Sequence, residues 1–379
     1  MNFTDLNLIP ELQKALRNLH FTQPTPIQQL SIPHLLNGKD LMGGAQTGTG
    51  KTAAFGLPLI QKLAKQNRSN LPQPKALILA PTRELAAQIA TSLTELGKYT
   101  RVRVTTIYGG VSISNQIKSL QKGTDILIAT PGRLLDLLHQ GHIDTRHIAT
   151  LILDEADRMV DMGFIKDVRT IINRLPAKRQ NVLFTATLSN EIRKFSQSVL
   201  LNPEVVEIES VNKHKEVIDQ SIYFVSRQDK RKLLTEILKE RHADNVLVFM
   251  RTKRGADRLA KTLQKSNINT ASIHGDKSQN QRENALAGFK QKKIRVLVAT
   301  DLAARGIDIS QLPLVVNYDL PDTPETYIHR IGRTGRAGEN GLAFSFCSEE
   351  DKSMLQQINR HLNTSIRVQK DHPYHVNLN

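Results

Sequence analysis

Short apolar runs rich in Val, Ile and Leu alternate along this chain with longer amphipathic or polar segments. Such alternation is typical of βα units, and consecutive βα units build parallel sheets with helices on both faces. The predicted strands are 75–80, 102–107, 125–129, 150–153, 181–185, 220–225, 245–250, 270–273, 294–299, 314–317 and 341–346. The pattern therefore predicts an α/β fold with mostly parallel sheets flanked by helices.

The length of the chain and a break in its pattern predict two domains. A chain of 379 residues exceeds the size of an ordinary single domain. The alternation is diluted near 202–217, which contains Pro203 and a polar run at 209–216. We predict an N-terminal domain over 1–207, a linker over 208–217 and a C-terminal domain over 218–379.

Composition indicates a soluble protein that stays inside the cell. Charged residues make up 23% of the chain, and no apolar stretch approaches the roughly 18 residues that a membrane helix needs. The first residues, MNFTDL, lack the basic region and apolar segment of a secretory signal. The single cysteine allows no intrachain disulfide, so we expect a cytoplasmic protein without a membrane partner.

The charge of the chain indicates a polyanionic partner. The formal net charge is +16, and Lys and Arg are spread along the whole sequence instead of gathering in a tail. Nucleic acid is the partner that this balance favours. A basic surface that is only solvated remains the alternative.

The segment 45–52, AQTGTGKT, has the pattern of a phosphate-binding loop between a strand and a helix. Glycines there let backbone N–H groups surround an anion in front of a helix N-terminus. Lys51 is expected to reach the β- and γ-phosphates, and the Thr52 hydroxyl to bind Mg²⁺. Ala45 replaces the first glycine of the pattern, and an ordinary Gly/Thr loop is the alternative. The predicted cradle consists of Ala45, Gln46, Thr47, Gly48, Thr49, Gly50, Lys51 and Thr52.

Two further segments supply the remaining chemistry of phosphoryl transfer. The apolar run at 150–153 ends in Asp154 and Glu155, which predicts a carboxylate for the metal followed by a base that positions water. The segment 329–336, HRIGRTGR, offers Arg333 and Arg336 as mobile positive charges for the γ-phosphate. An acidic helix cap and a basic helix facing solvent or RNA are the respective alternatives.

The order and spacing of these segments resemble the DEAD-box ATP-dependent RNA helicases of superfamily 2, from about residue 3 to about residue 350. The tetrapeptide 154–157, DEAD, is the signature of that family. The resemblance implies two tandem RecA-like domains, with ATP and Mg²⁺ as cofactors. The residues at 251–256 and 301–308 are similar to those of the bacterial RhlE-like subgroup.

The resemblance also assigns residues that bind the nucleotide and residues that couple it to RNA. The segment 21–28, FTQPTPIQ, is similar to the adenine-reading Q motif of the family, although His20 stands where the family usually has glycine. Gln28 is expected to bind the adenine edge, Phe3 to stack on the base beside Phe21, and Asp308 to bind the ribose. Coupling of hydrolysis to unwinding is expected from Asp157, Thr185, Thr187 and His329.

The RNA contacts implied by the resemblance lie in both domains. They fit phosphate and sugar recognition, because arginines, hydroxyls and glycine N–H groups bind those parts of a strand. The predicted contacts are Arg83, Gly110, Thr130 and Arg133 in the first domain and Gln279, Arg282 and Thr300 in the second.

The resemblance therefore implies an ATP-dependent RNA helicase that binds single strands and short duplexes without sequence preference and unwinds them locally or remodels RNA–protein complexes. An ATP-gated RNA clamp or annealing chaperone is one alternative, and a DNA-directed superfamily 2 translocase is another. We expect a monomer, and proteins of ribosome assembly or RNA decay are candidate partners.

Overall fold

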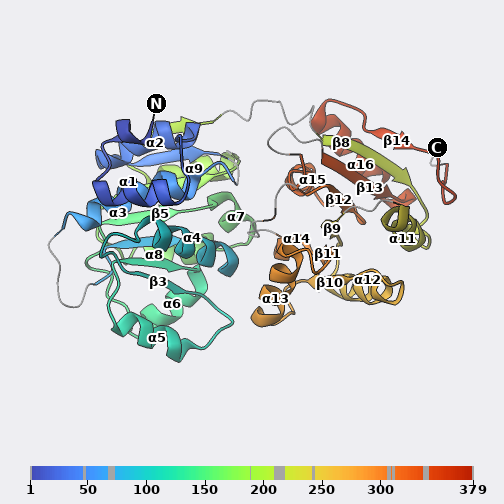
Figure 1. Ribbon diagram of the computed structural model, residues 1–379. Helices are drawn as coiled ribbons and strands as arrows, with labels where there is room; N and C mark the ends of the chain where they lie inside the picture. Colours follow the sequence, from blue (N-terminus) through green and yellow to red (C-terminus); the bar gives the residue numbers. More distant parts are fainter. Residues whose placement is uncertain are drawn as a thin grey trace. The chain divides into compact units, whose positions relative to one another are not determined.

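The chain folds into two compact units, residues 1–210 (unit 1) and 211–379 (unit 2) (Figure 1). The computed structural model describes residues 2–45, 48–66, 73–187, 189–208, 218–240, 244–304, 309, 312–335 and 341–377. The predicted linker lies outside these residues from 209 to 217, so its bounds stay a prediction. Among the described helices, none combines the length and the apolar character needed to cross a membrane.

Unit 1 is built on a seven-stranded sheet in which every pair of neighbouring strands is parallel, in the order β3-β4-β2-β5-β6-β1-β7. Its strands are β1 (Leu41–Gly44), β2 (Ala76–Leu79), β3 (Val104–Ile107), β4 (Ile126–Ala129), β5 (Thr150–Leu153), β6 (Gln180–Thr185) and β7 (Glu204–Glu207). Its described helices are η1 (Phe3–Leu6), α1 (Pro10–Asn18), α2 (Pro26–Leu36), α3 (Lys51–Ala64), α4 (Arg83–Leu96), α5 (Ile113–Gln121), α6 (Pro131–His139), α7 (Ala156–Asp161), α8 (Ile165–Ile172) and α9 (Asn190–Val199).

Unit 2 repeats this plan, with a parallel sheet in the order β10-β11-β9-β12-β13-β8-β14. Its strands are β8 (Ile218–Phe224), β9 (Val246–Phe249), β10 (Thr270–Ile273), β11 (Val296–Ala299), β12 (Leu314–Asn317), β13 (Gly341–Cys347) and β14 (Arg367–Gln369). Its described helices are α11 (Lys230–Glu240), α12 (Lys253–Lys265), α13 (Gln279–Lys290), α14 (Asp301–Ala304), α15 (Pro324–Ile331), η2 (Glu349–Asp351) and α16 (Lys352–Leu362).

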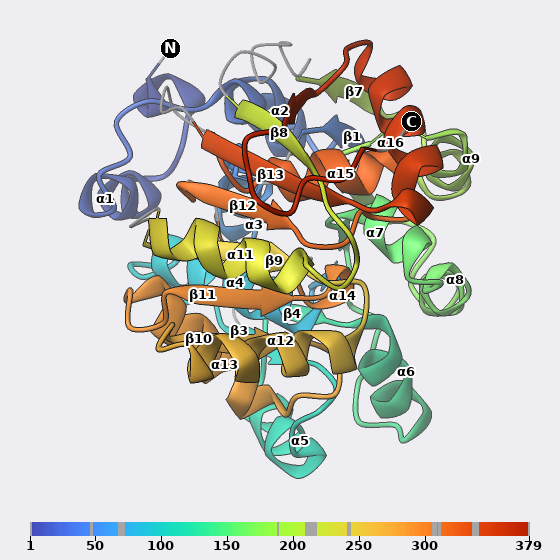
Figure 2. The ribbon, with the colours of Figure 1, turned by 90° about the vertical axis from the view of Figure 1, so that its right-hand side faces the viewer.

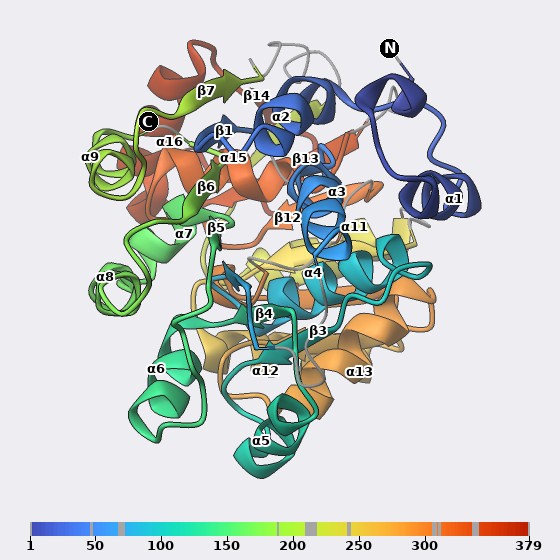
Figure 3. The same ribbon diagram turned by 90° about the vertical axis from the view of Figure 1, so that its left-hand side faces the viewer.

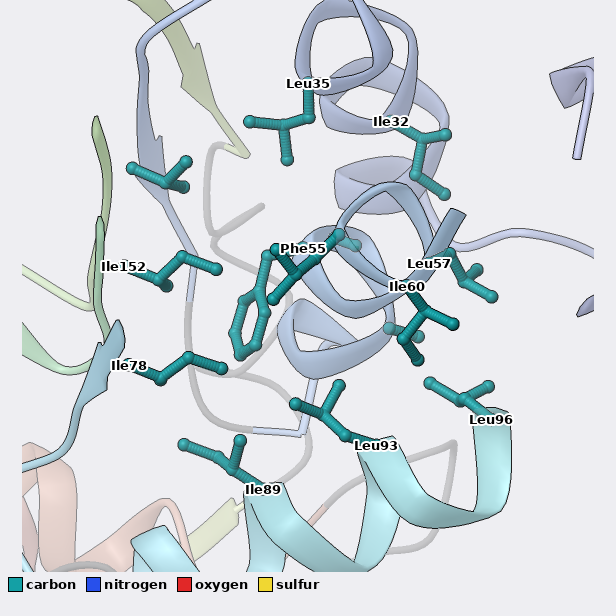
Figure 4. Close-up of a cluster of buried hydrophobic side chains, with 14 of the residues drawn as sticks. Ile32, Leu35, Phe55, Leu57, Ile60, Ile78, Ile89, Leu93, Leu96 and Ile152 are labelled. Carbon is teal, nitrogen blue, oxygen red and sulfur yellow. The ribbon is translucent and has the colours of Figure 1, made fainter. Parts of the chain in front are cut away.

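Both faces of the unit 1 sheet are buried, which explains why its central strands are apolar at nearly every position. Successive side chains of a strand point to opposite faces, so Ile78 packs toward α2, α3 and α4 while Leu77 packs toward α6 and α8. Figure 3 shows these two helical layers with the strands between them. Phe55 of α3 fills the space between helix and sheet in Figure 4.

Unit 2 has the same three layers. Helices α11 and α12 cover one face of its sheet through residues such as Leu234 and Leu259 (Figure 2). Helices α13, α15 and α16 cover the other face, where Phe289 and Tyr327 are fully buried. The fold predicted from the alternating pattern is confirmed, since each of the eleven predicted runs overlaps one strand.

Three observed strands lie outside the eleven predicted runs: β1, which was expected only as the strand before the phosphate loop, and β7 and β14, which each lie at the edge of a sheet. Strand β7 has the sequence EVVE; its Val206 is buried in the core, whereas Val205, which points to the opposite face of the sheet, is 57% exposed. Strand β14 has three residues. Neither has the buried apolar run that identifies a central strand, and β7 lies inside the stretch 202–217 where the alternating pattern is diluted.

Candidate functional site

The predicted nucleotide-binding and coupling segments follow three neighbouring strands of unit 1. The loop 45–50 follows β1, the segment 185–187 ends β6, and Asp154 follows β5. Strands β5, β6 and β1 are adjacent in the sheet, and parallel strands end at the same edge. The carboxyl edge of an open parallel sheet is where such folds bind ligands. The structure therefore brings these segments together.

The loop before α3 has the backbone of an anion cradle. Gly48 and Gly50 adopt left-handed conformations, with φ angles of 83° and 91°. Gly50 is the residue that caps α3, so the helix N-terminus opens directly onto the loop. A Cβ atom on Gly50 would lie 2.4 Å from Nε2 of Gln28. Gln46 and Thr47 lie outside the described residues.

Gln28 connects the N-terminal helices to the cradle. Its Oε1 accepts a hydrogen bond from the backbone N–H of Thr25 at 3.0 Å, and its Nε2 donates one to the carbonyl oxygen of Gly50 at 3.0 Å. The side chain is 3% exposed. A glutamine amide has two N–H donors and two acceptor lone pairs, so one of each remains for a further ligand.

Lys51 begins α3 and points back into the loop. Its Nζ donates a hydrogen bond to the carbonyl oxygen of Ala45 at 3.0 Å, and the side chain is buried. Thr52, the next residue, is half-buried. The departure of Ala45 from the glycine pattern is explained by its place at the end of β1. Ala45 is buried, and its N–H donates to the Thr185 carbonyl at 2.9 Å.

Asp154 is fully buried beside the cradle. Burial raises its pKa to about 6, the charge of Lys51 opposes this rise, and the neighbouring Glu155 and Asp157 add to it. Its Oδ1 accepts a hydrogen bond from the N–H of Glu155 at 3.0 Å. A buried carboxylate with a raised pKa gains most from a cation at the same place. Carboxylate and hydroxyl oxygens are the ligands that Mg²⁺ uses, so Asp154 and Thr52 fit this metal.

Glu155 forms a buried ion pair with Arg158, which was not singled out from the sequence. The carboxylate of Glu155 accepts from Nη1 of Arg158, and the side chains are 5% and 10% exposed. The Nε and Nη2 atoms of Arg158 are buried and have no hydrogen-bond partner among the described residues. The spacing of three residues on a helix was the available signal, because such residues are neighbours on one face.

Asp157 joins the acidic segment to the end of β6. Its Oδ2 accepts hydrogen bonds from the N–H of Ala186 at 3.1 Å, the N–H of Thr187 at 3.0 Å and the hydroxyl of Thr187 at 3.1 Å. The Thr185 hydroxyl donates to the Thr187 carbonyl at 2.8 Å. Three of the predicted coupling residues thus form one hydrogen-bonded cluster.

The two aromatic residues expected near the base lie against each other. The rings of Phe3 and Phe21 stack with centroids 6.3 Å apart. Phe3 is 6% exposed and Phe21 is 42% exposed. Phe21 is therefore the more accessible of the two, and Phe3 supports it from behind.

The predicted RNA contacts of unit 1 follow the other half of the same sheet edge, at strands β2, β3 and β4. Nη1 of Arg83 donates to the Gly109 carbonyl at 3.1 Å. Gly110 has a φ of 80°, and a Cβ atom there would lie 1.8 Å from the Arg83 guanidinium. Thr130 caps α6, and Nη1 of Arg133 donates to the Val111 carbonyl at 3.3 Å.

In unit 2, the predicted contacts lie at the carboxyl ends of β10 and β11. Thr300 follows β11, is 7% exposed, and its N–H donates to the Ile273 carbonyl of β10 at 3.3 Å. Gln279 is the first residue of α13, and its Nε2 donates to Glu283 at 2.7 Å. Arg282 is one turn further along the same helix and is buried.

The arginine segment of unit 2 is anchored by the buried Arg330, whose ion pair with the half-buried Asp301 the sequence did not single out. Arg330 binds Asp301 through two hydrogen bonds, of 2.6 and 2.7 Å, and also donates to Asn317 at 3.1 Å. His329, near the end of α15, is exposed, and Arg333, directly after the helix cap, is half-buried. Arg336 and Asp308 lie outside the described residues.

Unit 1 also contains a cavity of about 510 Å³ away from these residues. It is lined by Lys75 and Asp125, which precede β2 and β4, and by Tyr99 and Arg101 before β3. These positions belong to the amino edge of the sheet, opposite the edge that carries the predicted segments. The cavity is therefore separate from the candidate site.

Two family models match the chain. Residues 25–195 match the DEAD/DEAH box helicase family, and residues 229–338 match the helicase conserved C-terminal domain. The chain is 44% identical to the ATP-dependent RNA helicase CshA of Limosilactobacillus reuteri, covering 95% of this chain and 72% of that protein. It is also 44% identical to the ATP-dependent RNA helicase RhlB of Pseudomonas syringae pv. tomato, covering 96% and 93%.

Solved structures show the same similarity. S. cerevisiae Dbp5 bound to RNA and ADP BeF3 matches with a TM-score of 0.86 at 32% identity, over 97% of this chain and 95% of that one. A DEAD box protein from the hyperthermophile Methanococcus jannaschii matches with a TM-score of 0.55 at 40% identity, over 98% and 99%. The RhlE-like placement is not addressed by these relatives and stays a prediction.

Proposed function

This chain belongs to the DEAD-box family of ATP-dependent RNA helicases, and we propose that it couples ATP hydrolysis to local separation of short RNA duplexes without sequence preference. The observation that carries the proposal is that Gln28 and Lys51 both donate to backbone carbonyls of the loop before α3, those of Gly50 and Ala45, while the charge of Lys51 acts on the buried Asp154. The carboxyl edge of the unit 1 sheet thereby carries side chains that can bind the base, the phosphates and the metal ion of one nucleotide.

The side chains of unit 1 have separate roles in this proposal. Gln28 binds the adenine edge and Phe3, beside the more accessible Phe21, stacks on the base, while Lys51 leaves the Ala45 carbonyl to bind phosphate. Thr52 and Asp154 hold Mg²⁺, and the chemistry that this ion supplies is neutralisation of charge on the phosphate oxygens. Glu155 orients and deprotonates the attacking water, while Arg158 holds its carboxylate in place. Gly48, Gly50 and the helix N-terminus bind the phosphates through backbone N–H groups.

The groups of unit 2 complete the catalytic set. Arg333 and Arg336 stabilise the charge that develops during phosphoryl transfer, and Asp308 binds the ribose. Because carboxylates and arginines belong to different units, neither unit alone hydrolyses ATP well. We assign His329 of unit 2, together with Asp157, Thr185 and Thr187 of unit 1, to the coupling of hydrolysis to RNA unwinding.

RNA binding involves mainly phosphate and sugar. Arg83, Gly110, Thr130 and Arg133 form the contact set of unit 1, and Gln279, Arg282 and Thr300 form that of unit 2. Backbone contacts carry no sequence information and weaken as salt rises. We therefore expect low sequence preference and salt-sensitive binding.

The test is displacement of a labelled strand from a short RNA duplex, with an excess of unlabelled strand as trap. The proposal predicts release that requires ATP, and an ATPase rate that RNA stimulates and an equal concentration of DNA does not. Prolonged ATP-dependent retention of RNA without strand release would instead support the clamp or annealing alternative. Stimulation by DNA alone would support the translocase alternative.

The cellular setting belongs to the same proposal. We predict a monomer in the cytoplasm, with partner proteins of ribosome assembly or RNA decay. The RNAs crosslinked in cells to a Glu155→Gln protein, which is expected to retain ATP and RNA, identify the targets. An RNA population identical to that of a Lys51→Ala protein would contradict ATP-dependent target binding.

A further inference from the structure

One face of α12 carries four basic side chains in a single line. Arg254, Arg258, Lys261 and Lys265 are spaced by four, three and four residues, which places them on the same side of an α-helix. With a rise of about 1.5 Å per residue, the line spans about 16 Å along the axis. The opposite face of α12 is apolar and packs on the sheet through Ala256, Leu259, Ala260 and Leu263. We call the four residues the α12 basic stripe.

The α12 basic stripe is open to solvent and keeps its positive charge. All four side chains are exposed, and none forms an ion pair with another residue that the structure describes. Asp257 within α12 and Asp276 after β10 are engaged by other side chains, although the charge of Arg254 also acts on Asp276. Asp257 accepts from Ser272 at 2.5 Å and lies 3.0 Å from His274 and 2.8 Å from Lys277. Asp276 is paired with Lys253 at 2.6 Å.

The stripe begins beside the predicted RNA contacts of unit 2. Helix α12 is capped by Thr252, three residues after the end of β9. The N–H of Met250 donates to the Ala299 carbonyl at 2.9 Å, so this turn neighbours Thr300 at the sheet edge. From there α12 runs across β11 and β10, and it is the gold helix of Figure 2. The stripe therefore extends from the predicted RNA contacts at the carboxyl edge of the sheet toward its amino edge.

The chemistry of this surface favours a phosphate backbone over a protein partner. Protein interfaces have apolar and aromatic centres and are depleted in lysine. Among the described residues, the exposed large apolar side chains are Phe21, Leu30, Val111, Leu201 and Val205, and all of them lie in unit 1. A row of like charges without an apolar neighbour matches a polyanion whose charges also repeat along a line.

We propose that the α12 basic stripe binds the phosphates of RNA that extends beyond the contact set of unit 2. This inference rests on the proposed function, because it assumes RNA at Thr300, Gln279 and Arg282. The α12 basic stripe would lengthen the RNA segment that the protein contacts, without making sequence-specific contacts. The expected consequence is tighter binding of long RNA than of short RNA.

The experiment compares a stripe variant, Arg254→Gln, Arg258→Gln, Lys261→Gln and Lys265→Gln, with the parent protein on two RNAs. The short RNA is the shortest that still stimulates the parent ATPase, and the long RNA extends it at either end. Glutamine keeps the helix propensity of the replaced residues. The stripe variant is expected to match the parent on the short RNA. On the long RNA its affinity is expected to fall about tenfold, and the salt slope to decrease by about 0.7 for each phosphate that the variant no longer binds.

A second variant controls for total charge. Lys166→Gln, Arg169→Gln, Arg174→Gln and Lys178→Gln remove four exposed charges in and after α8 of unit 1. This control is expected to bind the long RNA more tightly than the stripe variant does. Equal binding of long RNA by parent and stripe variant overturns the inference, as does an equal loss of affinity in the control. Failure of the parent to respond to any RNA would instead count against the proposed function.

Discussion

The side-chain amide of Gln28 donates a hydrogen bond of 3.0 Å to the carbonyl oxygen of Gly50. Gln28 belongs to α2, and Gly50 caps α3 at the end of the phosphate loop. The residue expected to read the base is thus attached to the loop expected to hold the phosphates. Binding of phosphate at the loop can therefore change the hydrogen bonds of Gln28, because a shift of the Gly50 peptide moves the carbonyl oxygen to which Gln28 donates.

Replacement of Gly50 by alanine should abolish nucleotide binding. The added Cβ would lie 2.4 Å from Nε2 of Gln28, and the φ of 91° is unfavourable for any residue with a side chain. Gly38→Ala is the matched control, since Gly38 also has a positive φ, of 74°, but nothing lies within 4 Å of its added Cβ. We expect both variants to be destabilised by about 1 kcal/mol from the backbone alone. Titration with a fluorescent ATP analogue should show lost affinity for Gly50→Ala only, and equal affinities would contradict the close contact.

Asp154 should make the stability of the free protein fall as pH rises. The pKa of Asp154 is about 6 in the folded protein and 3.8 for an unperturbed carboxyl, so the folded state holds the proton more tightly. Between about pH 4 and 6 the folded protein therefore binds more protons than the unfolded chain, and its unfolding free energy decreases with pH. Asp154→Asn cannot ionise and should be more stable than the parent at pH 7, by about 2 to 3 kcal/mol.

Urea denaturation at pH 5 and pH 7, without nucleotide or Mg²⁺, measures this difference. Asp144→Asn serves as the control, because hydrogen bonds from Arg146 lower the pKa of Asp144 to about 2, outside the tested range. The advantage of Asp154→Asn over the parent should grow with pH, while the Asp144→Asn difference should stay constant. An advantage of Asp154→Asn that does not change with pH would contradict the raised pKa.

Arg158 should stabilise unit 1 through its pairing with Glu155. Both side chains are buried, so Arg158→Met leaves a buried carboxylate without its partner. Loss of one partner from a buried pair costs about 3 to 5 kcal/mol, whereas replacing both is much less harmful. A double-mutant cycle of Glu155→Gln and Arg158→Met, followed by urea denaturation, should therefore be strongly non-additive. Additive effects would show that the two side chains do not interact.

Arg330→Lys should destabilise unit 2 although the charge is kept. The guanidinium makes two hydrogen bonds to Asp301 and lies 4.9 Å from the ring centre of Phe249. A lysine cannot reproduce this planar, two-pronged contact. We expect a loss of about 2 to 4 kcal/mol in thermal or chemical unfolding of unit 2. Arg367→Lys, at an exposed position of β14, is the control and should change stability little; equal effects would rule out the buried contact as the cause.

The sequence predicted those elements in which the same physical requirement applies to several successive residues. Buried parallel strands must be apolar along most of their length, so runs such as 150–153 and 314–317 were predicted with their observed bounds. The edge strands β7 and β14 were missed because neither has a buried apolar run: Val205 of β7 is exposed, and β14 has three residues. The phosphate loop was recognisable because few residue types allow backbone N–H groups to surround an anion.

The contacts that hold the site together could not be predicted from the sequence. Nothing in the spacing of Gln28 and Gly50, or of Asp301 and Arg330, reveals that these residues touch, because their proximity depends on the order of strands in the sheet. The pairing of Glu155 with Arg158 was accessible in principle from helical spacing. Whether an arginine at that position turns inward depends on packing around α7.

The central claim is that unit 1 binds ATP and uses Glu155 to activate water. Single-turnover hydrolysis of ATP by Glu155→Gln, with saturating RNA, tests it most directly, provided that ATP binding is measured on the same protein. The account predicts parental ATP affinity and a hydrolysis rate reduced by about a hundredfold or more, as expected for loss of a general base. Hydrolysis at the parental rate would contradict the role of Glu155 and with it the proposed site.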